Sequence, residues 1–342
     1  MTRFAYDDQI AAIPHAVREA LAREVPALDP ERPILFSGIG TSLHAARVAA
    51  TWIARLSAGQ VRPHAVDAHD LGTGAVPIAP GDQVVVISHR GTKLFPNAAL
   101  ARAREAGAAP TIAIVGQSAP EQAAHHTIRT CPNETAGTFS VSYLASLAAL
   151  ARLAAPFEAA GDAFARALPE LPEALERTLA MPMPEAAVGA LAEAHPVLVV
   201  GFGDDLVTAQ EAALKLKEGA WIWTEAMSPE FALHGTPAAF HPEMGAVILE
   251  PDMDDRGRSA LLREVLTRLG LRPVLTCGSA RDGLEAPTLP FAPAPHPLLR
   301  PMLAIVPFHR LTAELARLRG TDPDTLHGHR EPWKTIMTGV RL

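Results

Sequence analysis

The chain has 342 residues, 48% of them hydrophobic, and a formal net charge of -7 at pH 7. This length allows two domains with separate cores, and the composition is that of a globular protein. The negative charge, together with the lack of a basic stripe interleaved with aromatic residues, argues against a nucleic-acid surface.

The cysteine content and the apolar segments indicate a cytoplasmic protein. Cys131 and Cys277 are far apart and too few for a disulfide framework or a zinc site, which favours a reducing compartment. The first residues contain no apolar signal core. The longest apolar-leaning stretch, 137–157, is interrupted by Arg152 and three serines, so we expect a buried alanine-rich helix there and no membrane span.

Apolar residues at helical spacing predict an N-terminal helix over 9–23. Short apolar runs then alternate with helical patterns up to the middle of the chain. This alternation is typical of a mainly parallel sheet with helices on both faces. The predicted strands are 34–37, 62–67, 83–88, 111–115 and 127–130, and the predicted helices are 43–56, 96–106 and 140–153.

A cluster of prolines after residue 168 predicts a linker, and the second half repeats the same scheme. Its predicted strands are 197–201, 244–250, 273–277 and 288–291, and its predicted helices are 206–219, 258–269 and 299–319. We therefore divide the chain into an N-terminal helical segment (1–30), a first α/β domain (31–168), a linker (169–190), a second α/β domain (191–320) and a polar C-terminal tail (321–342).

Two loops about half a chain apart have the same construction. Each joins an apolar strand to a helix, and they run Gly38-Ile39-Gly40-Thr41-Ser42 and Gly201-Phe202-Gly203-Asp204-Asp205. Such a repeat predicts a duplicated α/β unit. The hydroxyl and N–H groups of the first loop lie at the positive end of a helix and suit a phosphate, whereas the two carboxylates of the second loop would repel one. We therefore expect one anion site, in the first domain.

The strongest local signal is the run at 211–220, which contains Leu214-Lys215-Leu216-Lys217-Glu218 and is followed by His234-Gly235. Together with the loop at 34–42 and the tail at 334–338, it resembles the sugar isomerase (SIS) family, including the isomerase half of glucosamine-6-phosphate synthase. The resemblance implies an α/β fold of two tandem SIS domains, each a flavodoxin-like αβα sandwich, with no metal and no redox cofactor. No cysteine follows Met1 as an N-terminal nucleophile, so we do not expect glutamine-dependent synthesis.

The resemblance also implies three catalytic residues. Glu218 is the base that moves a proton between adjacent carbons, and Lys215 helps to hold the site. His234 opens the sugar ring, although Thr236 interrupts the family's His-Gly-Pro. Lys334 meets the open-chain carbonyl, as a Schiff base or as a cation beside developing oxyanion charge. The residues alone leave open a solvated helix face, a structural histidine and a solvated lysine. His327 and His329 lack the carboxylates or thiols that a metal site would need.

The loop after the third strand departs from the family pattern. The family has Ser-Gln-Ser-Gly-Glu-Thr, and this chain has Ser88-His89-Arg90-Gly91-Thr92-Lys93; a later Ser-Thr-Lys is replaced by Phe139-Ser140-Val141. Arginine binds phosphate or carboxylate through a planar fork, so anion binding is retained or strengthened. A surface basic cluster is the alternative. The predicted phosphate- and substrate-binding residues are Gly40, Thr41, Ser42, Ser88, His89, Arg90, Gly91, Lys93 and Glu134.

These patterns predict a phosphosugar isomerase-type enzyme without a glutaminase domain. It would isomerise an aldose or ketose phosphate, or deaminate or deglycate an aminosugar phosphate, by proton transfer next to a carbonyl or imine. The resemblance implies a homodimer in which His234 enters the neighbouring subunit's site, with no nucleic-acid or membrane partner. The alternative is a non-catalytic sugar-phosphate-binding regulator, although the first thirty residues are too short for the usual helix-turn-helix domain. A dinucleotide-binding oxidoreductase is disfavoured, because the third glycine that its motif needs after Gly38 and Gly40 is missing.

Overall fold

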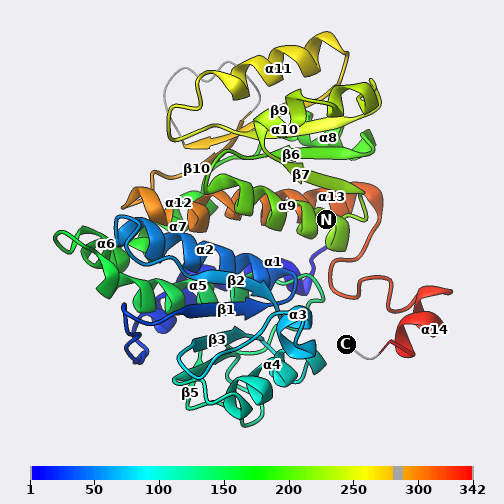
Figure 1. The fold of residues 1–342 in the computed structure, drawn as a ribbon. Helices are drawn as coiled ribbons and strands as arrows, with labels where there is room; N and C mark the ends of the chain where they lie inside the picture. Colours follow the sequence, from blue (N-terminus) through cyan, green and yellow to red (C-terminus); the bar gives the residue numbers. More distant parts are fainter. Residues whose placement is uncertain (1, 280–287, 341–342) are drawn as a thin grey trace. The chain divides into compact units, whose positions relative to one another are not determined.

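The structure, a computed structural model, describes residues 2–279 and 288–340, and it forms two compact units with one sheet each (Figure 1). Helix α1 (Ala5–Leu21) begins in one unit and ends in the other. The first-sheet unit comprises the described residues of Ala12–Glu134, Phe139–Pro172 and His327–Leu342. The second-sheet unit comprises those of Met1–Ala11, Thr135–Thr138 and Glu173–Leu326.

The first sheet has five parallel strands in the order β2-β1-β3-β4-β5. The inner strands are apolar and fully buried, as expected for a sheet covered on both faces. Leu35, Val84 and Val115 share an apolar cluster with Leu71 of α3 and Leu100 of α4. These two helices cover one face of the sheet (Figure 1). The strands are β1 (Ile34–Gly38), β2 (His64–Asp67), β3 (Gln83–Ile87), β4 (Thr111–Val115) and β5 (His126–Arg129); the helices are α2 (Thr41–Leu56), α3 (Ala68–Thr73), α4 (Leu94–Glu105), α5 (Val141–Ala154), α6 (Ala163–Ala167) and α14 (Trp333–Thr338), with short 3-10 turns at Ala155–Phe157 and Leu168–Glu170.

The second sheet is also parallel, in the order β10-β9-β8-β6-β7. Its strands are β6 (Val197–Val200), β7 (Thr224–Met227), β8 (Gly245–Leu249), β9 (Val274–Ser279) and β10 (Thr288–Phe291). When β6 to β10 are renumbered 1 to 5 and the order is read from the β7 edge, it becomes 2-1-3-4-5, which is the strand order of the first sheet. The predicted fold class and the duplication are therefore confirmed. The helices are α7 (Leu171–Leu179), α8 (Glu185–Glu193), α9 (Asp205–Gly219), α10 (Pro229–Leu233), α11 (Arg258–Arg268), α12 (Arg300–Ala304) and α13 (Val306–Arg319), with 3-10 turns at Thr236–Ala239 and Pro297–Leu299.

The duplication extends to the backbone of the two strand–helix loops. Gly40 and Gly203 have φ angles of 56° and 58°, in the left-handed region that favours glycine. A β-carbon added to Gly38 would lie 2.5 Å from the carbonyl carbon of Ser42, and one added to Gly201 would lie 2.1 Å from the carbonyl oxygen of Asp205. Both tight turns therefore require glycine at the end of the strand.

Several elements differ from the sequence-based predictions, and the short helices α3, α6, α10 and α14 were not predicted. The edge strand β7 was not predicted, because its sequence Thr-Glu-Ala-Met contains no apolar run. The predicted helix 299–319 is two helices, α12 and α13, separated at Ile305 shortly before Pro307. Helix α1 starts four residues earlier than predicted, because the Asp324 carboxylate accepts hydrogen bonds from the N–H groups of Ala5 and Tyr6 at 2.8 and 2.9 Å. Most of the predicted linker 169–190 is helical, in α7 and the start of α8.

The alanine-rich segment forms the predicted buried helix. In α5 every residue except Arg152 is buried. Among the described residues, no helix is both long enough and apolar enough to cross a membrane.

Candidate functional site

The carboxyl ends of β1 and β3 mark a switch point of the first sheet. These neighbouring strands pair in parallel, and the chain leaves them toward opposite edges, from β1 to β2 and from β3 to β4. Ligands of open α/β sheets bind in the crevice at such a point. The loops Gly38–Ser42 and Ser88–Lys93 both start there, so the structure brings the two predicted anion-binding loops together.

Helix α2 begins at the first of these loops. Its N-cap is Gly40, which has no side chain to cap the helix, and Thr41 and Ser42 are half-buried in the first turn. The N–H of Ser42 donates to the Ile39 carbonyl at 3.1 Å. The amino end of a helix of this length carries a partial positive charge, which favours an anion.

The second loop presents two buried polar groups. Ser88 and His89 are each 6% exposed, and Ser88 Oγ and His89 Nδ1 have no hydrogen-bond partner among the described residues. His89 Nε2 accepts the N–H of Glu134 at 3.2 Å, so the proton of a neutral ring is on Nδ1. Burial, and then the charge of Arg90, lowers the pKa of His89 to about 4. At neutral pH, His89 is therefore an uncharged hydrogen-bond donor.

Two cations complete this loop. The Arg90 guanidinium lies 5.4 Å from the centre of the Phe139 ring, and Phe139 also meets the edge of the His89 ring. Lys93 is half-buried, and its pKa is lowered by burial and by Arg90. Among the described residues, neither Arg90 nor Lys93 pairs with a carboxylate. The two positive charges, with the Ser88 and His89 donors, form a local environment that suits an anion.

Hydrogen bonds fix the backbone at Gly91 and the side chain of Glu134, whose backbone N–H donates to His89. Gly91 has a φ of 64°, and its carbonyl accepts the side-chain amides of Asn97 and Gln122 at 3.3 and 3.2 Å. The Glu134 carboxylate accepts the N–H groups of Ser140 and Ser142 at 2.9 and 2.8 Å, and so caps α5. Its charge stabilises the amino end of that helix. A substrate-binding role for Glu134 stays a prediction, because its oxygens already serve α5.

The loop after β6, which corresponds to the loop after β1, ends at a buried ion pair. Arg300 Nε donates to both Asp205 oxygens at 3.1 and 2.9 Å, and Arg300 also donates to the Glu250 carbonyl. Burial raises the pKa of Asp205 to about 6, and the guanidinium opposes this shift. The loop after β6 is therefore neutralised from within its own unit, whereas the loop after β3 carries cations without acidic partners among the described residues.

The predicted base lies on α9 in a cluster of three charged side chains. Glu211, Lys215 and Glu218 share one face of the helix. The side chains of Glu211 and Lys215 are 0% exposed, and that of Glu218 is 26% exposed. Lys215 Nζ lies 2.5 Å from Glu218 Oε2 and 3.4 Å from Glu211 Oε1. The alternative that these side chains form a solvated helix face is wrong for Glu211 and Lys215. Of the two carboxylates, solvent reaches only that of Glu218.

The other two predicted catalytic residues are exposed. His234 ends α10, and its Nε2 lies 2.9 Å from Glu230 Oε1, which belongs to a carboxylate that also accepts from Arg258. The Thr236 hydroxyl donates to the Phe231 carbonyl at 3.0 Å and closes the turn. Lys334 lies on α14 and belongs to the first-sheet unit, whereas Glu218 and His234 belong to the second-sheet unit. The joint action of these three residues stays a prediction.

Sequence reasoning missed several residues that hold these groups. Gln122 and Asn97 fix Gly91, Arg300 neutralises Asp205, and Phe139 packs against His89. Phe139 was noted only as part of the altered Phe139-Ser140-Val141 segment, and the other three belong to no local motif; each acts through a partner more than five residues away. Among the described residues, no group of three His, Cys, Asp or Glu side chains is arranged to hold a metal ion.

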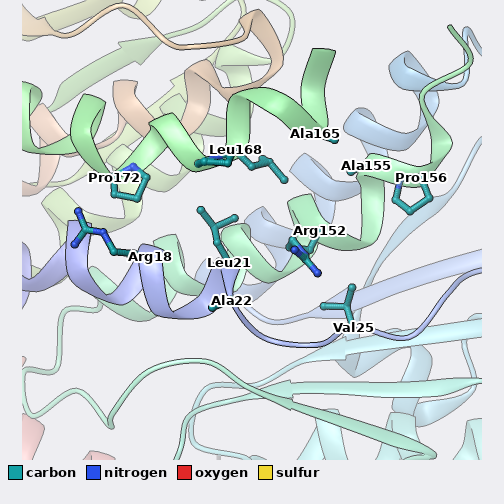
Figure 2. A pocket seen from close by; sticks show the side chains of 11 residues that line it. Arg18, Leu21, Ala22, Val25, Arg152, Ala155, Pro156, Ala165, Leu168 and Pro172 are labelled. Atoms are coloured by element: carbon teal, nitrogen blue, oxygen red, sulfur yellow. The ribbon is translucent and has the colours of Figure 1, made fainter. Parts of the chain in front are cut away.

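A separate pocket of about 630 Å³ in the first-sheet unit contains none of the predicted site residues (Figure 2). Its lining is mainly apolar, with the two arginines Arg18 and Arg152, and comes from the ends of α1 and α5 and from the segment around α6. All its other lining residues are alanine, leucine, valine or proline, so no side chain there accepts a hydrogen bond from a sugar hydroxyl.

Comparisons with known proteins match part of the chain to a family of domains. Residues 27–156 match the family model described as SIS domain. The chain is 29% identical to the glutamine–fructose-6-phosphate aminotransferase [isomerizing] of Pseudomonas putida over 328 residues, which are 88% of this chain and 52% of the relative. The chain thus spans about half the length of the curated relatives it matches.

Two solved structures have the same fold. The C-terminal domain of glucosamine-fructose-6-phosphate aminotransferase from Francisella tularensis has a TM-score of 0.81 at 18% identity, covering 94% of this chain and 98% of that domain. Glucosamine-6-phosphate deaminase from Thermotoga maritima has a TM-score of 0.72 at 18% identity, covering 94% and 97%. The chain therefore carries a SIS domain over residues 27–156, and the resemblance to the SIS family predicted from its sequence is confirmed.

Proposed function

We propose that this chain acts on a sugar phosphate, as an isomerase or an aminosugar-phosphate deaminase or deglycase. The observation that carries the proposal is the group of donors and cations after β3. There, the donors of Ser88 and His89 and the cations of Arg90 and Lys93 meet at the switch point of the SIS domain. The names of similar proteins, an isomerising aminotransferase and a deaminase of hexose phosphates, support the same class.

In this proposal Glu218 is the base. It removes a proton from the carbon next to the substrate carbonyl or imine, and the resulting enediol or enamine takes the proton back at the neighbouring carbon. Its partial exposure leaves the carboxylate accessible, while the buried Lys215 ammonium fixes its orientation. His234 moves a proton to or from the ring oxygen, and Lys334 stabilises the open-chain carbonyl. The exposure of both side chains leaves them available to a substrate.

A screen of hexose and aminohexose phosphates for ketose or ammonia formation tests this function. We expect turnover of at least one phosphate and none of the matching unphosphorylated sugar. In the Arg90→Ala/Lys93→Ala variant the KM for that substrate should rise by one to two orders of magnitude, because each lost charge-assisted hydrogen bond weakens binding by roughly tenfold. Equal use of phosphorylated and free sugars would contradict the assignment. Tight phosphosugar binding without turnover would favour the regulatory alternative.

We also propose a homodimer in which His234 serves the neighbouring subunit. Mixing inactive Glu218→Gln and His234→Ala chains should then restore part of the activity, because hybrid dimers contain one site with both residues intact. Each variant kept alone through the same mixing procedure is the control. An absence of rescue, in a mixture that demonstrably exchanges subunits, would show that each chain supplies its own histidine.

A further inference from the structure

A buried tyrosine–histidine pair lies in the second-sheet unit. His309 of α13 is 0% exposed, and its Nδ1 lies 2.9 Å from the hydroxyl oxygen of Tyr6, which is itself 0% exposed. The two rings meet edge to face, with centroids 6.1 Å apart. His309 Nε2 has no hydrogen-bond partner among the described residues. Burying a polar ring atom without a hydrogen-bond partner costs free energy of folding, so the unpaired Nε2 indicates a functional role for His309.

The helix that carries His309 packs on the helix that carries the charged cluster. A β-carbon added to Gly219 of α9 would come 2.4 Å from Thr312 Cγ2 of α13, and Arg319 Nε donates to the Ala220 carbonyl at 3.1 Å where both helices end. His309 precedes Thr312 by about one turn, as Lys215 precedes Gly219, so the two side chains lie at corresponding levels of neighbouring helices. Burial, and then the charge of Lys215, lowers the pKa of His309 to about 3, while Glu211 opposes this shift. The imidazole is therefore neutral and within the electrostatic influence of Lys215.

The ammonium selects the tautomer of the ring. A lone pair facing a cation is favoured over an N–H facing it, so the ring proton belongs on Nδ1, where it donates to the Tyr6 hydroxyl oxygen. Nε2 is then an acceptor. Lys215 carries three donors, and Glu218 binds one of them at 2.5 Å. Glu211 Oε1 lies farther from the ammonium, at 3.4 Å. When Glu218 takes up a proton it becomes a weaker acceptor, and a further acceptor then stabilises the buried ammonium.

We propose that His309, oriented by Tyr6, is a positioning residue whose Nε2 accepts a hydrogen bond from the Lys215 ammonium while Glu218 holds a proton. This inference rests on the proposed role of Glu218 as the base. Lys215 then keeps its place during the proton transfer, and the Glu218 carboxylate is restored in the same orientation after each turnover. His309 is buried, so it does this without touching the substrate.

Two substitutions at His309 separate hydrogen bonding from packing. His309→Gln retains an acceptor, whereas His309→Met fills a similar volume without a strong one. We expect kcat to fall on the order of tenfold in His309→Met, the equivalent of one hydrogen bond to a charged group, and to be largely kept in His309→Gln. KM should change little in both. Tyr6→Phe should lower kcat in part, and Tyr143→Phe, at the chain's other tyrosine, which is 2% exposed and lies in the first-sheet unit, is its control. Equal losses in the Met and Gln variants would overturn the proposal.

A second measurement needs no substrate. The chain contains only four lysines, Lys93, Lys215, Lys217 and Lys334, so the ammonium spectrum of ¹⁵N-lysine-labelled protein is simple to assign. In Glu218→Gln, which imitates the protonated carboxyl, the Lys215 ammonium protons should exchange with solvent about tenfold more slowly than when His309→Met is added. An unchanged exchange rate would refute the role of His309. Failure to find any sugar-phosphate turnover would instead count against the proposed function and leave this result standing.

Discussion

The buried pair of Asp205 and Arg300 allows a quantitative prediction about the second sheet. Their side chains are 4% and 8% exposed, so Arg300→Met leaves a carboxylate that is both desolvated and without its cation. Removing one partner of a buried ion pair typically costs about 3–5 kcal/mol of the free energy of unfolding. We expect a loss of that size at pH 8, and a smaller loss in mildly acidic solution.

The pH dependence follows from Asp205. Its folded pKa of about 6 lies above the ordinary value of 3.8, so its contribution to stability is complete below 3.8 and is lost as the pH rises through 6. Without Arg300 the folded pKa rises further, and the loss continues to higher pH. The difference in unfolding free energy between wild type and Arg300→Met should therefore widen above pH 6, by up to roughly 1.4 kcal/mol per pH unit.

Urea unfolding followed by circular dichroism at pH 5, 6, 7 and 8 measures this difference, and the titration of other groups cancels between the two proteins. The control is Asp205→Leu combined with Arg300→Met, which removes both charges and should recover most of the stability at pH 8. A difference in unfolding free energy that does not change with pH, or a difference below about 1 kcal/mol at pH 8, would contradict this prediction. Either result would show that the Asp205 carboxylate is solvated.

Three further predictions concern the first sheet. Gly38→Ala places a β-carbon 2.5 Å from the backbone of the first turn of α2 and should weaken phosphate binding in calorimetry, whereas Gly81→Ala, with no atom within 4 Å of its added β-carbon, should not. Glu134→Gln should cost about 1–2 kcal/mol in urea unfolding, because α5 loses its charged cap; an unchanged midpoint would contradict this. In an NMR titration His89 should stay neutral down to about pH 4, and its contribution to stability should decline below pH 6.5; titration near 6.5 would show that it is solvated.

The sequence predicted the inner strands and most helices because their patterns are local. Val84-Val85-Val86-Ile87 is a continuous β-branched run, as buried parallel strands require, and the two glycine loops repeat with the same spacing. The edge strand β7 could not be found this way, since only one of its edges pairs with another strand and its sequence mixes polar and apolar residues. Likewise, the carboxylate that caps α1 belongs to Asp324, more than three hundred residues along the chain.

The candidate site shows the same limit. Spacing placed Glu211, Lys215 and Glu218 on one helix face, but only the fold shows that the first two are buried and the third is not. The loop after β3 was proposed as an anion site from the order of its residues, and anion binding there stays a prediction. Two buried pairs could not be predicted, because Arg300 and His309 reach Asp205 and Tyr6 across about one hundred and three hundred residues of sequence.

In the proposed mechanism, Glu218 transfers a proton beside the carbonyl of a sugar phosphate. The most direct test is the rate at which deuterium from D₂O enters the carbon next to the carbonyl of the substrate that the screen identifies, in wild type and in Glu218→Gln. We expect incorporation by the wild type and a fall of roughly 10²–10⁴-fold in the variant, with substrate affinity little changed. Incorporation by Glu218→Gln at the wild-type rate would contradict it.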